Sequence, residues 1–276
     1  MLQILQGKTT EVGEFPFSVL LGYRSRVYRG MLPGGKRHYR DEFSWICSGV
    51  ILNSRFILTA AHCRLRGRRM VVRVGVHKIP SYYNEQFSSL RGRSSSEDFY
   101  LDQESFILHE DFIKERTSKG QLRLKNDIAL IKLDKDIVFS QTIQPVCWRN
   151  TRIEDDITSP TVVGWGKTYS DQITKINGVY SSDQLKLKVP IVPLDVCREE
   201  FSVDSGHLCA GGVPGQDSCS GDSGGGLFSR SEDTGVWSVI GIVSYGSRSC
   251  GTGSPGVYTR VSSYEHWILE KMNPEI

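Results

Sequence analysis

Short apolar and alternating runs recur along the chain between turn-forming residues. Runs of this kind are typical of buried or half-buried strands. Many short strands with almost no helix favour a barrel or a sandwich, so the sequence predicts an all-β fold. The predicted strands cover Phe15–Tyr23, Trp45–Leu52, Phe56–Ala60, Met70–Val76, Ser105–Leu108, Ile128–Leu133, Thr161–Trp165, Leu185–Val192, Leu208–Ala210, Gly226–Phe228, Trp237–Tyr245 and Gly256–Arg260.

Polar stretches between these runs are predicted to be surface loops of the β body rather than interdomain linkers. They fall at 24–44, 80–104, 112–126, 166–184 and 229–236. One helix is predicted, at the C-terminus, where Ser262 and Glu265 fit a capping box. Apolar residues then recur at helical spacing, at Tyr264, Trp267, Ile268 and Met272.

Composition is that of a globular protein, with 276 residues, 38% apolar and 24% charged. A chain of this length can bury one large or two small cores. No run approaches the roughly 18 apolar residues of a membrane-spanning helix. The first residues also lack the features of a secretion signal, so we expect no membrane partner.

The chain has 7 cysteines without a Cys-x-x-Cys pair. This spacing favours disulfides over zinc and therefore an oxidising compartment. The number is odd, so one sulfur stays free or pairs outside the chain. We therefore expect a processed module of a longer secreted precursor.

Positive charge is concentrated in two segments, although the net charge is only +3. Neither contains an acidic residue, and we expect them to form one exosite for a polyanion or an acidic macromolecule. Their cations are Arg24, Arg26, Arg29, Lys36, Arg37 and Arg40 in 24–40, and Arg64, Arg66, Arg68 and Arg69 in 64–69.

Three residues suggest covalent catalysis by a serine. Ser223 lies in Asp217-Ser-Cys-Ser-Gly-Asp-Ser-Gly-Gly-Gly226, and His62 lies in Leu58-Thr-Ala-Ala-His-Cys63. A serine hydroxyl is a poor nucleophile until a histidine accepts its proton. Asp127 begins the apolar run Asp127–Leu133 and supplies a carboxylate that could orient the histidine.

A rival interpretation is the nucleophile elbow of α/β-hydrolases, because Gly221-Asp-Ser-Gly-Gly225 also fits Gly-x-Ser-x-Gly. Asp233 and His266 follow in that fold's order. The elbow must open directly into a helix, whereas Gly224-Gly-Gly226 leads into a predicted strand.

From Ile4 to Met272 the chain resembles the protease domain of the chymotrypsin/trypsin family. The resemblance is carried by Gly13-Glu-Phe-Pro-Phe17, Thr-Ala-Ala-His-Cys, Asn-Asp-Ile-Ala-Leu, Gly164-Trp-Gly166, Gly-Asp-Ser-Gly-Gly and Pro255-Gly-Val-Tyr258. It implies two six-stranded antiparallel Greek-key barrels packed face to face, with a C-terminal helix. The halves would be residues 4–135 and 136–276, with the active site between them.

The resemblance also assigns roles. Ser223 would be the nucleophile, His62 the general base and Asp127 the residue that orients it. The amides of Gly221 and Ser223 would form the oxyanion hole. Asp217 would be the acid at the bottom of a pocket for Arg or Lys. Gly246 and Gly256 would keep the wall of that pocket open. Ser244 and Tyr245 would contact the substrate backbone and the next subsite.

Disulfides implied by the resemblance are Cys47–Cys63, Cys197–Cys209 and Cys219–Cys250. Cys147 is left over, and in family members with pro-regions the matching cysteine tethers that region. Activation would free the amine of Ile4 to pair with Asp222. Gln3 stands where Arg or Lys is usual, so an unusual activator is implied, or residues 1–3 are not native.

The sequence therefore predicts a secreted serine endopeptidase, made as a zymogen and acting in a proteolytic cascade such as those of clip-domain proteases. Protein substrates and serpin-type inhibitors are the expected partners. No cofactor is expected, and no calcium, because Val76 stands where the family has an acidic ligand and only Glu85 remains. The alternative is a catalytically silent homologue that acts as a binding scaffold or cofactor.

Overall fold

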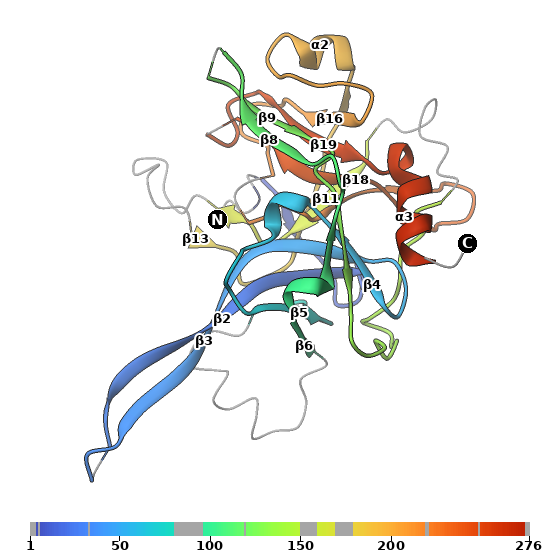
Figure 1. Cartoon of the computed structure of the whole chain (residues 1–276). Helices are drawn as coiled ribbons and strands as arrows, with labels where there is room; N and C mark the ends of the chain where they lie inside the picture. Colours follow the sequence, from blue (N-terminus) through green and yellow to red (C-terminus); the bar gives the residue numbers. More distant parts are fainter. Residues whose placement is uncertain are drawn as a thin grey trace.

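The computed structural model describes residues 4, 6–32, 34–79, 96–118, 120–149, 159–168, 179–218, 221–247 and 249–273. Two curled antiparallel sheets pack against each other, and a short helix closes the chain (Figure 1). This arrangement confirms the predicted all-β class. In the described part of the chain, no helix is long and apolar enough to cross a membrane.

The first sheet has seven strands in the order β6-β5-β2-β3-β4-β10-β7. All of them come from the N-terminal half of the chain. In chain order they are β2 (Ser18–Met31), β3 (Arg37–Ile51), β4 (Phe56–Thr59), β5 (Met70–Val74), β6 (Glu97–Leu101), β7 (Phe106–Leu108) and β10 (Ala129–Lys132).

The second sheet has eight strands in the order β1-β14-β11-β17-β18-β19-β16-β15. Its first strand comes from the start of the chain, because Lys8 and Thr9 pair with Lys186 and Leu185. The strands are β1 (Lys8–Thr9), β11 (Thr161–Gly164), β14 (Leu185–Lys188), β15 (Ile191–Val192), β16 (His207–Gly211), β17 (Gly226–Arg230), β18 (Trp237–Tyr245) and β19 (Pro255–Arg260).

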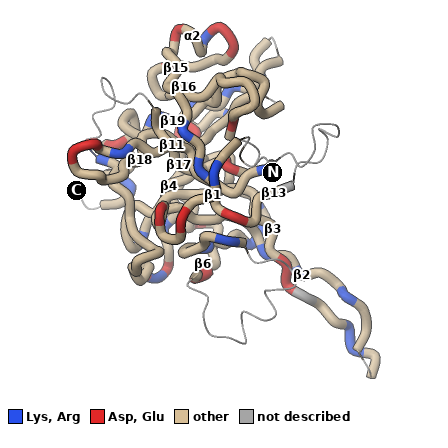
Figure 2. Tube along the Cα trace, turned by 180° about the vertical axis from the view of Figure 1, so that it is seen from behind, with Lys and Arg blue, Asp and Glu red and all other residues tan. Residues whose placement is uncertain are grey.

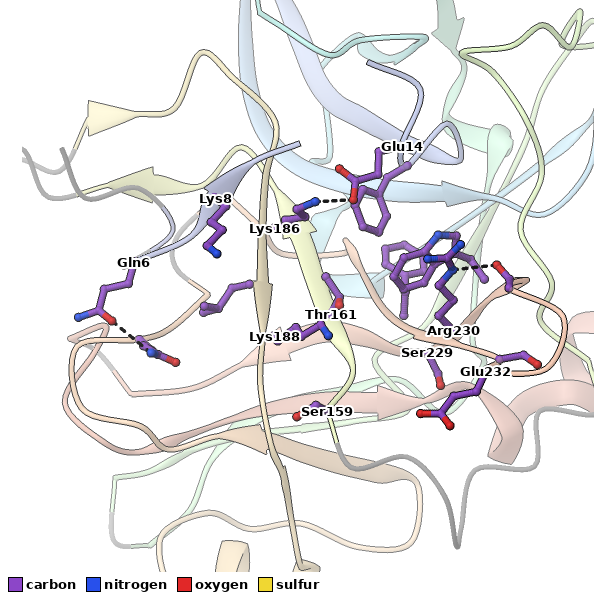
Figure 3. Close-up of a pocket in the computed structure, with 17 residues that line it drawn as sticks. Gln6, Lys8, Glu14, Ser159, Thr161, Lys186, Lys188, Ser229, Arg230 and Glu232 are labelled. Carbon is purple, nitrogen blue, oxygen red and sulfur yellow. Dashed lines mark hydrogen bonds and ion pairs between the residues drawn. The ribbon is translucent and has the colours of Figure 1, made fainter. Parts of the chain in front are cut away.

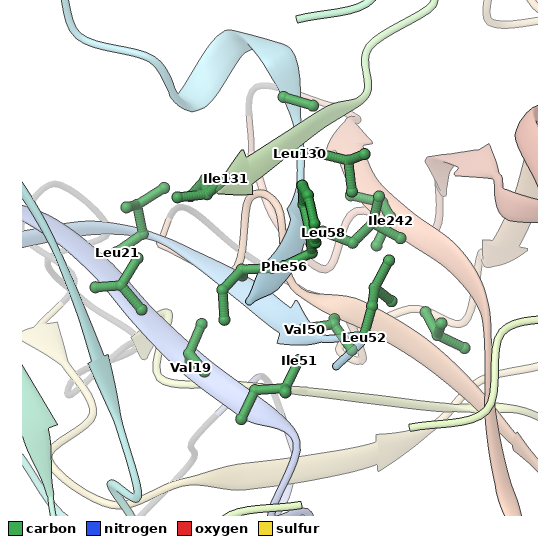
Figure 4. Packing of buried hydrophobic residues seen from close by; sticks show 14 of the residues in the cluster. Val19, Leu21, Val50, Ile51, Leu52, Phe56, Leu58, Leu130, Ile131 and Ile242 are labelled. Carbon is green, nitrogen blue, oxygen red and sulfur yellow. The ribbon is translucent and has the colours of Figure 1, made fainter. Parts of the chain in front are cut away.

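The main hydrophobic core crosses from one sheet to the other (Figure 4). Val19, Leu58 and Leu130 of the first sheet share this cluster with Phe228 and Ile242 of the second. The two halves therefore bury apolar surface against each other, and that burial fixes the residues at their junction.

Short helices and two small hairpins complete the described chain. The hairpins pair β8 (Ile113–Arg116) with β9 (Leu122–Lys125), and β12 (Lys167–Thr168) with β13 (Val179–Tyr180). The helical segments are η1 (Ala61–Cys63), η2 (Gln103–Ser105), α2 (Leu194–Arg198), η3 (Val261–Tyr264) and α3 (Glu265–Met272).

Several sequence predictions are corrected here. The predicted loop 24–44 is the outer part of the long hairpin formed by β2 and β3, and the loop predicted at 112–126 contains β8 and β9. The capping box is wrong, because α3 has Tyr264 at its N-cap and no side-chain cap bond. The run Leu185–Val192 is broken into two strands. Proline has no amide hydrogen, so Pro190 cannot donate to a ladder between them.

Candidate active site

His62 and Asp127 form a close pair between the two sheets. His62 lies on η1 just after β4, and Asp127 lies just before β10, the neighbour of β4. Nδ1 of His62 is 2.7 Å from Oδ2 of Asp127, and the His62 amide donates to Oδ1 at 2.9 Å. A ring nitrogen this close to a carboxylate carries the hydrogen, which leaves Nε2 as a proton acceptor.

Asp127 is buried and held from the second sheet. The Ser244 hydroxyl donates to its Oδ2 at 2.5 Å, and the Thr259 hydroxyl donates to its carbonyl at 2.8 Å. Burial by itself would raise the pKa of Asp127, but the charge and hydrogen bonds of His62, with the Ser244 hydroxyl, hold that pKa below its ordinary value. The carboxylate therefore stays charged and can stabilise a protonated His62.

Ser223 lies beside this pair, on a turn that only glycine permits. The carbonyl of Ser223 accepts from the Ser48 amide of β3 at 2.8 Å. Gly224 has φ +76, and a Cβ there would lie 2.3 Å from Thr59 Oγ1 and 3.1 Å from Cys63 Sγ. Because Cys63 follows His62, this close approach brings the serine next to the histidine.

Within the described residues, Nε2 of His62 makes no hydrogen bond to Oγ of Ser223. Nε2 lies 3.9 Å from the sulfur of Cys63. Catalytic hydrogen bonds often tighten only in the complex with substrate, so this geometry is compatible with a nucleophile and its base.

The turn before the serine fits an oxyanion hole. Gly221 has φ +106, and a Cβ there would lie 2.7 Å from the Tyr180 ring. Within the described residues, neither the Gly221 amide nor the Ser223 amide donates to a protein acceptor. Both amides are therefore available to an incoming oxygen.

Asp217 is partly buried and desolvated. Its Oδ2 accepts from the Gly251 amide at 3.0 Å. Burial raises the pKa of Asp217 to about 6, although the amides of Gly251 and Ser218 oppose the shift. A carboxylate in this state gains from a cation that fills the site.

The two predicted wall glycines lie next to each other. A Cβ on Gly246 would lie 3.7 Å from Cα of Gly256, and a Cβ on Gly256 would lie 3.2 Å from the Tyr258 ring. A side chain at 246 would therefore lie against Gly256, and a side chain at 256 would crowd Tyr258.

A second pocket, of about 380 Å³, adjoins Gly246 and was not predicted from the sequence. The β8–β9 hairpin and Phe201 close it against Tyr245, whose hydroxyl donates to the Ser202 carbonyl at 3.0 Å. No sequence pattern identified it, because its walls come from three segments that are distant in sequence.

Ile4 and Asp222 are both buried inside the second sheet. Ile4 packs in the apolar cluster that contains Val243 and Tyr258, and its exposed fraction is 0%. Asp222 is also 0% exposed, and its Oδ1 accepts from the Gly166 amide at 2.7 Å. A Cβ on Gly164 or Gly166 would lie 2.0 Å or 2.2 Å from a carboxylate oxygen of Asp222, so both positions require glycine.

Two predicted disulfides are present, Cys47–Cys63 and Cys197–Cys209. Cys250 is also disulfide-bonded, and its predicted partner, Cys219, lies outside the described residues. Cys147 is free and exposed.

In the described chain, one cluster has the composition of a metal site, Cys47, His62 and Cys63, but its two sulfurs are joined to each other in a disulfide. Glu85, of the calcium prediction, lies outside the described residues.

The α/β-hydrolase interpretation is wrong, because the strand β17 begins at Gly226 where that fold needs a helix. His266, the histidine of that rival triad, lies on α3 near the end of the chain, whereas His62 lies on η1.

A larger groove, of about 1030 Å³, lies away from these residues on the outside of the second sheet (Figure 3). It extends from Gln6 near the start of the chain to Trp237 of β18, and Lys186 pairs with Glu14 within it. Cys147 lies beside one end of this groove, because its backbone forms an isolated β-bridge with Ser238, the neighbour of Trp237.

Comparison with known proteins places this geometry in a family. A family model described as Trypsin matches residues 4–268. The chain is 34% identical to the CLIP domain-containing serine protease B4 of Anopheles gambiae, over 98% of the chain and 70% of that protein. It is 33% identical to phenoloxidase-activating factor 1 of Holotrichia diomphalia, over 99% and 70%. Identity to the Spaetzle-processing enzyme of Drosophila melanogaster is 30%, over 99% and 67%.

Proposed function

The chain belongs to the trypsin family of serine endopeptidases, and on that premise we propose that it cleaves protein substrates after Arg or Lys. The observation that carries the proposal is the partly buried, desolvated carboxylate of Asp217, together with the close approach of Gly246 to Gly256. An unpaired buried charge is costly, and a guanidinium or ammonium group removes that cost.

His62, Asp127 and Ser223 act together in the proposed mechanism. Ser223 Oγ attacks the scissile carbonyl carbon while His62 Nε2 accepts its proton. Asp127 keeps the hydrogen on Nδ1 and stabilises the imidazolium. His62 then gives the proton to the leaving amine as the carbon–nitrogen bond breaks, and an acyl-enzyme remains. Water attacks the ester by the same route and frees Ser223.

The amides of Gly221 and Ser223 stabilise the oxyanion of both tetrahedral intermediates. Removing one such donor typically costs roughly 10²–10³ in rate. Ser244 positions Asp127 through its hydroxyl. With Tyr245 it also lines the path of the substrate backbone.

Activation by cleavage before Ile4 is part of the proposal. The buried side chain of Ile4 and the buried carboxylate of Asp222 support it: Ile4 packs in the apolar cluster that contains Tyr258, and Asp222 acts electrostatically on the same tyrosine. A free amine at Ile4 would then order the turn that carries Gly221.

Regulation in a cascade is proposed from the relatives, whose names include a phenoloxidase-activating factor and a Spaetzle-processing enzyme. Exposed Cys147 is the proposed attachment point of a tethered pro-region, and the groove of Figure 3 begins beside it. We also propose secretion, inhibition by serpin-type proteins, and a division into halves at 4–135 and 136–276.

An active-site titration tests the function. Protein beginning at Ile4 is mixed with a slowly deacylating Arg ester, and the initial burst of released alcohol is measured. The expected burst is close to one equivalent and disappears in Ser223→Ala. Absence of a burst in protein with a sequenced Ile4 terminus would favour the catalytically silent alternative.

A further inference from the structure

The outer part of the long β2–β3 hairpin, residues 24–44, projects from the body as a two-stranded ribbon (Figure 1). We call these residues the ribbon. β2 pairs with β5 only at Leu20–Tyr23, and β3 pairs with β4 only at Val50 and Ile51. Among the described strands, the ribbon therefore pairs only with itself, and both of its edges are open. Open edges offer unpaired main-chain groups to another chain.

One face of the ribbon carries aromatic rings and guanidinium groups in alternation. Tyr28 stands opposite Tyr39 with their rings 5.7 Å apart, and Arg26 lies 4.9 Å over the Tyr39 ring. Interactions of this kind contribute about 0.5–1 kcal/mol each at exposed sites. They give the ribbon a preferred shape in solution, although an isolated hairpin is only marginally stable.

The base of the ribbon is anchored more firmly. The Arg73 guanidinium lies over the stacked rings of Phe43 and Trp45, at 4.9 and 4.8 Å from their centroids. It also makes two hydrogen bonds to Asp98, at 2.6 and 2.9 Å. A planar guanidinium held by a carboxylate and two rings resists rotation. The ribbon is thus fixed where it leaves the first sheet.

Positive charge on the ribbon is only partly neutralised. Arg24 pairs with Asp41 and Arg29 pairs with Glu42, acids that lie just outside the basic segment 24–40. Asp41 also acts electrostatically on Arg26, whereas Lys36 and Arg37 make no ion pair within the described residues. Basic residues lie toward the tip of the ribbon, and acidic residues lie nearer its base (Figure 2).

The basic loop 64–69 lies against the base of the ribbon. The Arg24 amide donates to the Arg69 carbonyl at 3.1 Å, and the Arg68 guanidinium lies 5.0 Å over the Tyr23 ring. The two basic segments expected to meet are therefore adjacent in the structure.

Both segments lead directly to the catalytic residues. From the ribbon, β3 continues to Ser48, whose amide donates to the Ser223 carbonyl. The loop 64–69 comes directly after Cys63, which follows His62 and is joined to Cys47 by a disulfide. From Ser48 to Arg37 the strand spans about 35 Å at roughly 3.3 Å per residue. A substrate chain in extended form would cover that distance with about ten residues.

The geometry points to the ribbon as a docking arm for an extended acidic segment of the protein substrate, within about ten residues of the scissile bond. This inference rests on the proposed protease function. The unpaired cations provide charge complementarity, and the open edges suit a peptide main chain. Exposed apolar side chains near the tip favour a peptide over a sulfated polysaccharide, since Met31 is 70% exposed, Tyr28 51% and Leu32 49%.

The test uses protein beginning at Ile4 and two peptides with a single Arg cleavage site. One peptide has an acidic segment with a tyrosine five to ten residues beyond the site, and the other has Gln and Asn in place of the acids. We expect about tenfold higher kcat/KM for the acidic peptide at low salt, carried by KM. The preference should weaken as salt rises, because exposed charges are screened.

The variant Arg26→Glu/Lys36→Glu/Arg37→Glu should lose this preference and leave hydrolysis of a small Arg ester unchanged. The matched control, Lys132→Glu/Arg149→Glu/Lys188→Glu, changes the net charge equally at exposed positions away from the ribbon and should keep the preference. Equal cleavage of the two peptides by the unmutated enzyme, or an equal loss in the control variant, would overturn the inference. So would a ribbon that binds heparin and shows no preference between the peptides.

Failure of the protease function is distinguishable from failure of the docking arm. If the Arg ester is not hydrolysed, binding of the fluorescently labelled acidic peptide to Ser223→Ala protein still reports on the ribbon. Loss of that binding in the ribbon variant, with retention in the control variant, would support the docking arm by itself.

Discussion

The state of Asp217 predicts how substrate choice changes with pH. A pKa of about 6, against 3.8 for an ordinary aspartic acid, means that the folded pocket disfavours the ionised carboxylate. At 1.36 kcal/mol per pKa unit, this difference corresponds to about 3 kcal/mol. A bound guanidinium offsets this cost, whereas a neutral side chain of the same shape does not. We therefore expect discrimination on the order of 100-fold between arginine and citrulline substrates at pH 8.

The sign of the pH effect follows from the same shift. Below pH 6 the free enzyme protonates Asp217, so kcat/KM for the arginine ester falls by about tenfold per pH unit through this group. The citrulline ester meets no such loss. General base catalysis by His62 serves both esters alike, so the ratio of the two kcat/KM values isolates Asp217.

The assay measures this ratio from pH 5 to pH 8 with protein beginning at Ile4. It should be flat above pH 7 and decline below pH 6. In Asp217→Asn the ratio should be near one at every pH, while the burst of acylation by the citrulline ester persists. A ratio that stays constant across the range in the unmutated enzyme would refute the reasoning.

Stability provides an independent measurement of the same shift. Because the folded pKa of Asp217 is raised, the folded state binds the proton more tightly than the unfolded state does. The contribution of Asp217 to the free energy of unfolding should therefore increase as the pH falls from above 6 to below 4. Asp217→Asn should raise the free energy of unfolding at pH 7, by up to about 3 kcal/mol, and remove this pH dependence.

Three further predictions concern catalysis and activation. Ser223→Ala and His62→Ala should each lower kcat for an Arg ester by roughly 10⁴–10⁶-fold, and the double variant should lose little more, because the two residues serve one step; additive losses would contradict this. Ser244→Ala should lower kcat/KM for an Arg ester by about 10–100-fold, since a hydrogen bond to a buried charged group is worth about 1.5–3 kcal/mol. An unchanged kcat/KM would mean that Asp127 does not need this donor. The chain beginning at Met1 should be nearly inactive and gain activity when residues 1–3 are removed, because a free Ile4 amine can then pair with the Asp222 carboxylate. Equal rates of Arg-ester hydrolysis by the two forms, each confirmed by amino-terminal sequencing, would exclude this route of activation.

The sequence by itself determined the chemistry and the framework of this protein. His62, Asp127 and Ser223 stand in short segments with strong local requirements, such as the glycine turn around Ser223, and these segments can be recognised without coordinates. Strands such as Met70–Val74 and Trp237–Tyr245 were predictable because burial makes most of their residues apolar.

Only the tertiary structure decided features that depend on partners distant in sequence. The ribbon is solvated on both faces, so its sequence is polar and reads as a loop, and its strands are held by cross-strand pairs such as Arg24–Asp41 and Tyr28–Tyr39. Ser244 and Asp127 are 117 residues apart, and no local pattern predicts their hydrogen bond. The raised pKa of Asp217 likewise has its cause in burial, which exists only once the second sheet has closed around the carboxylate.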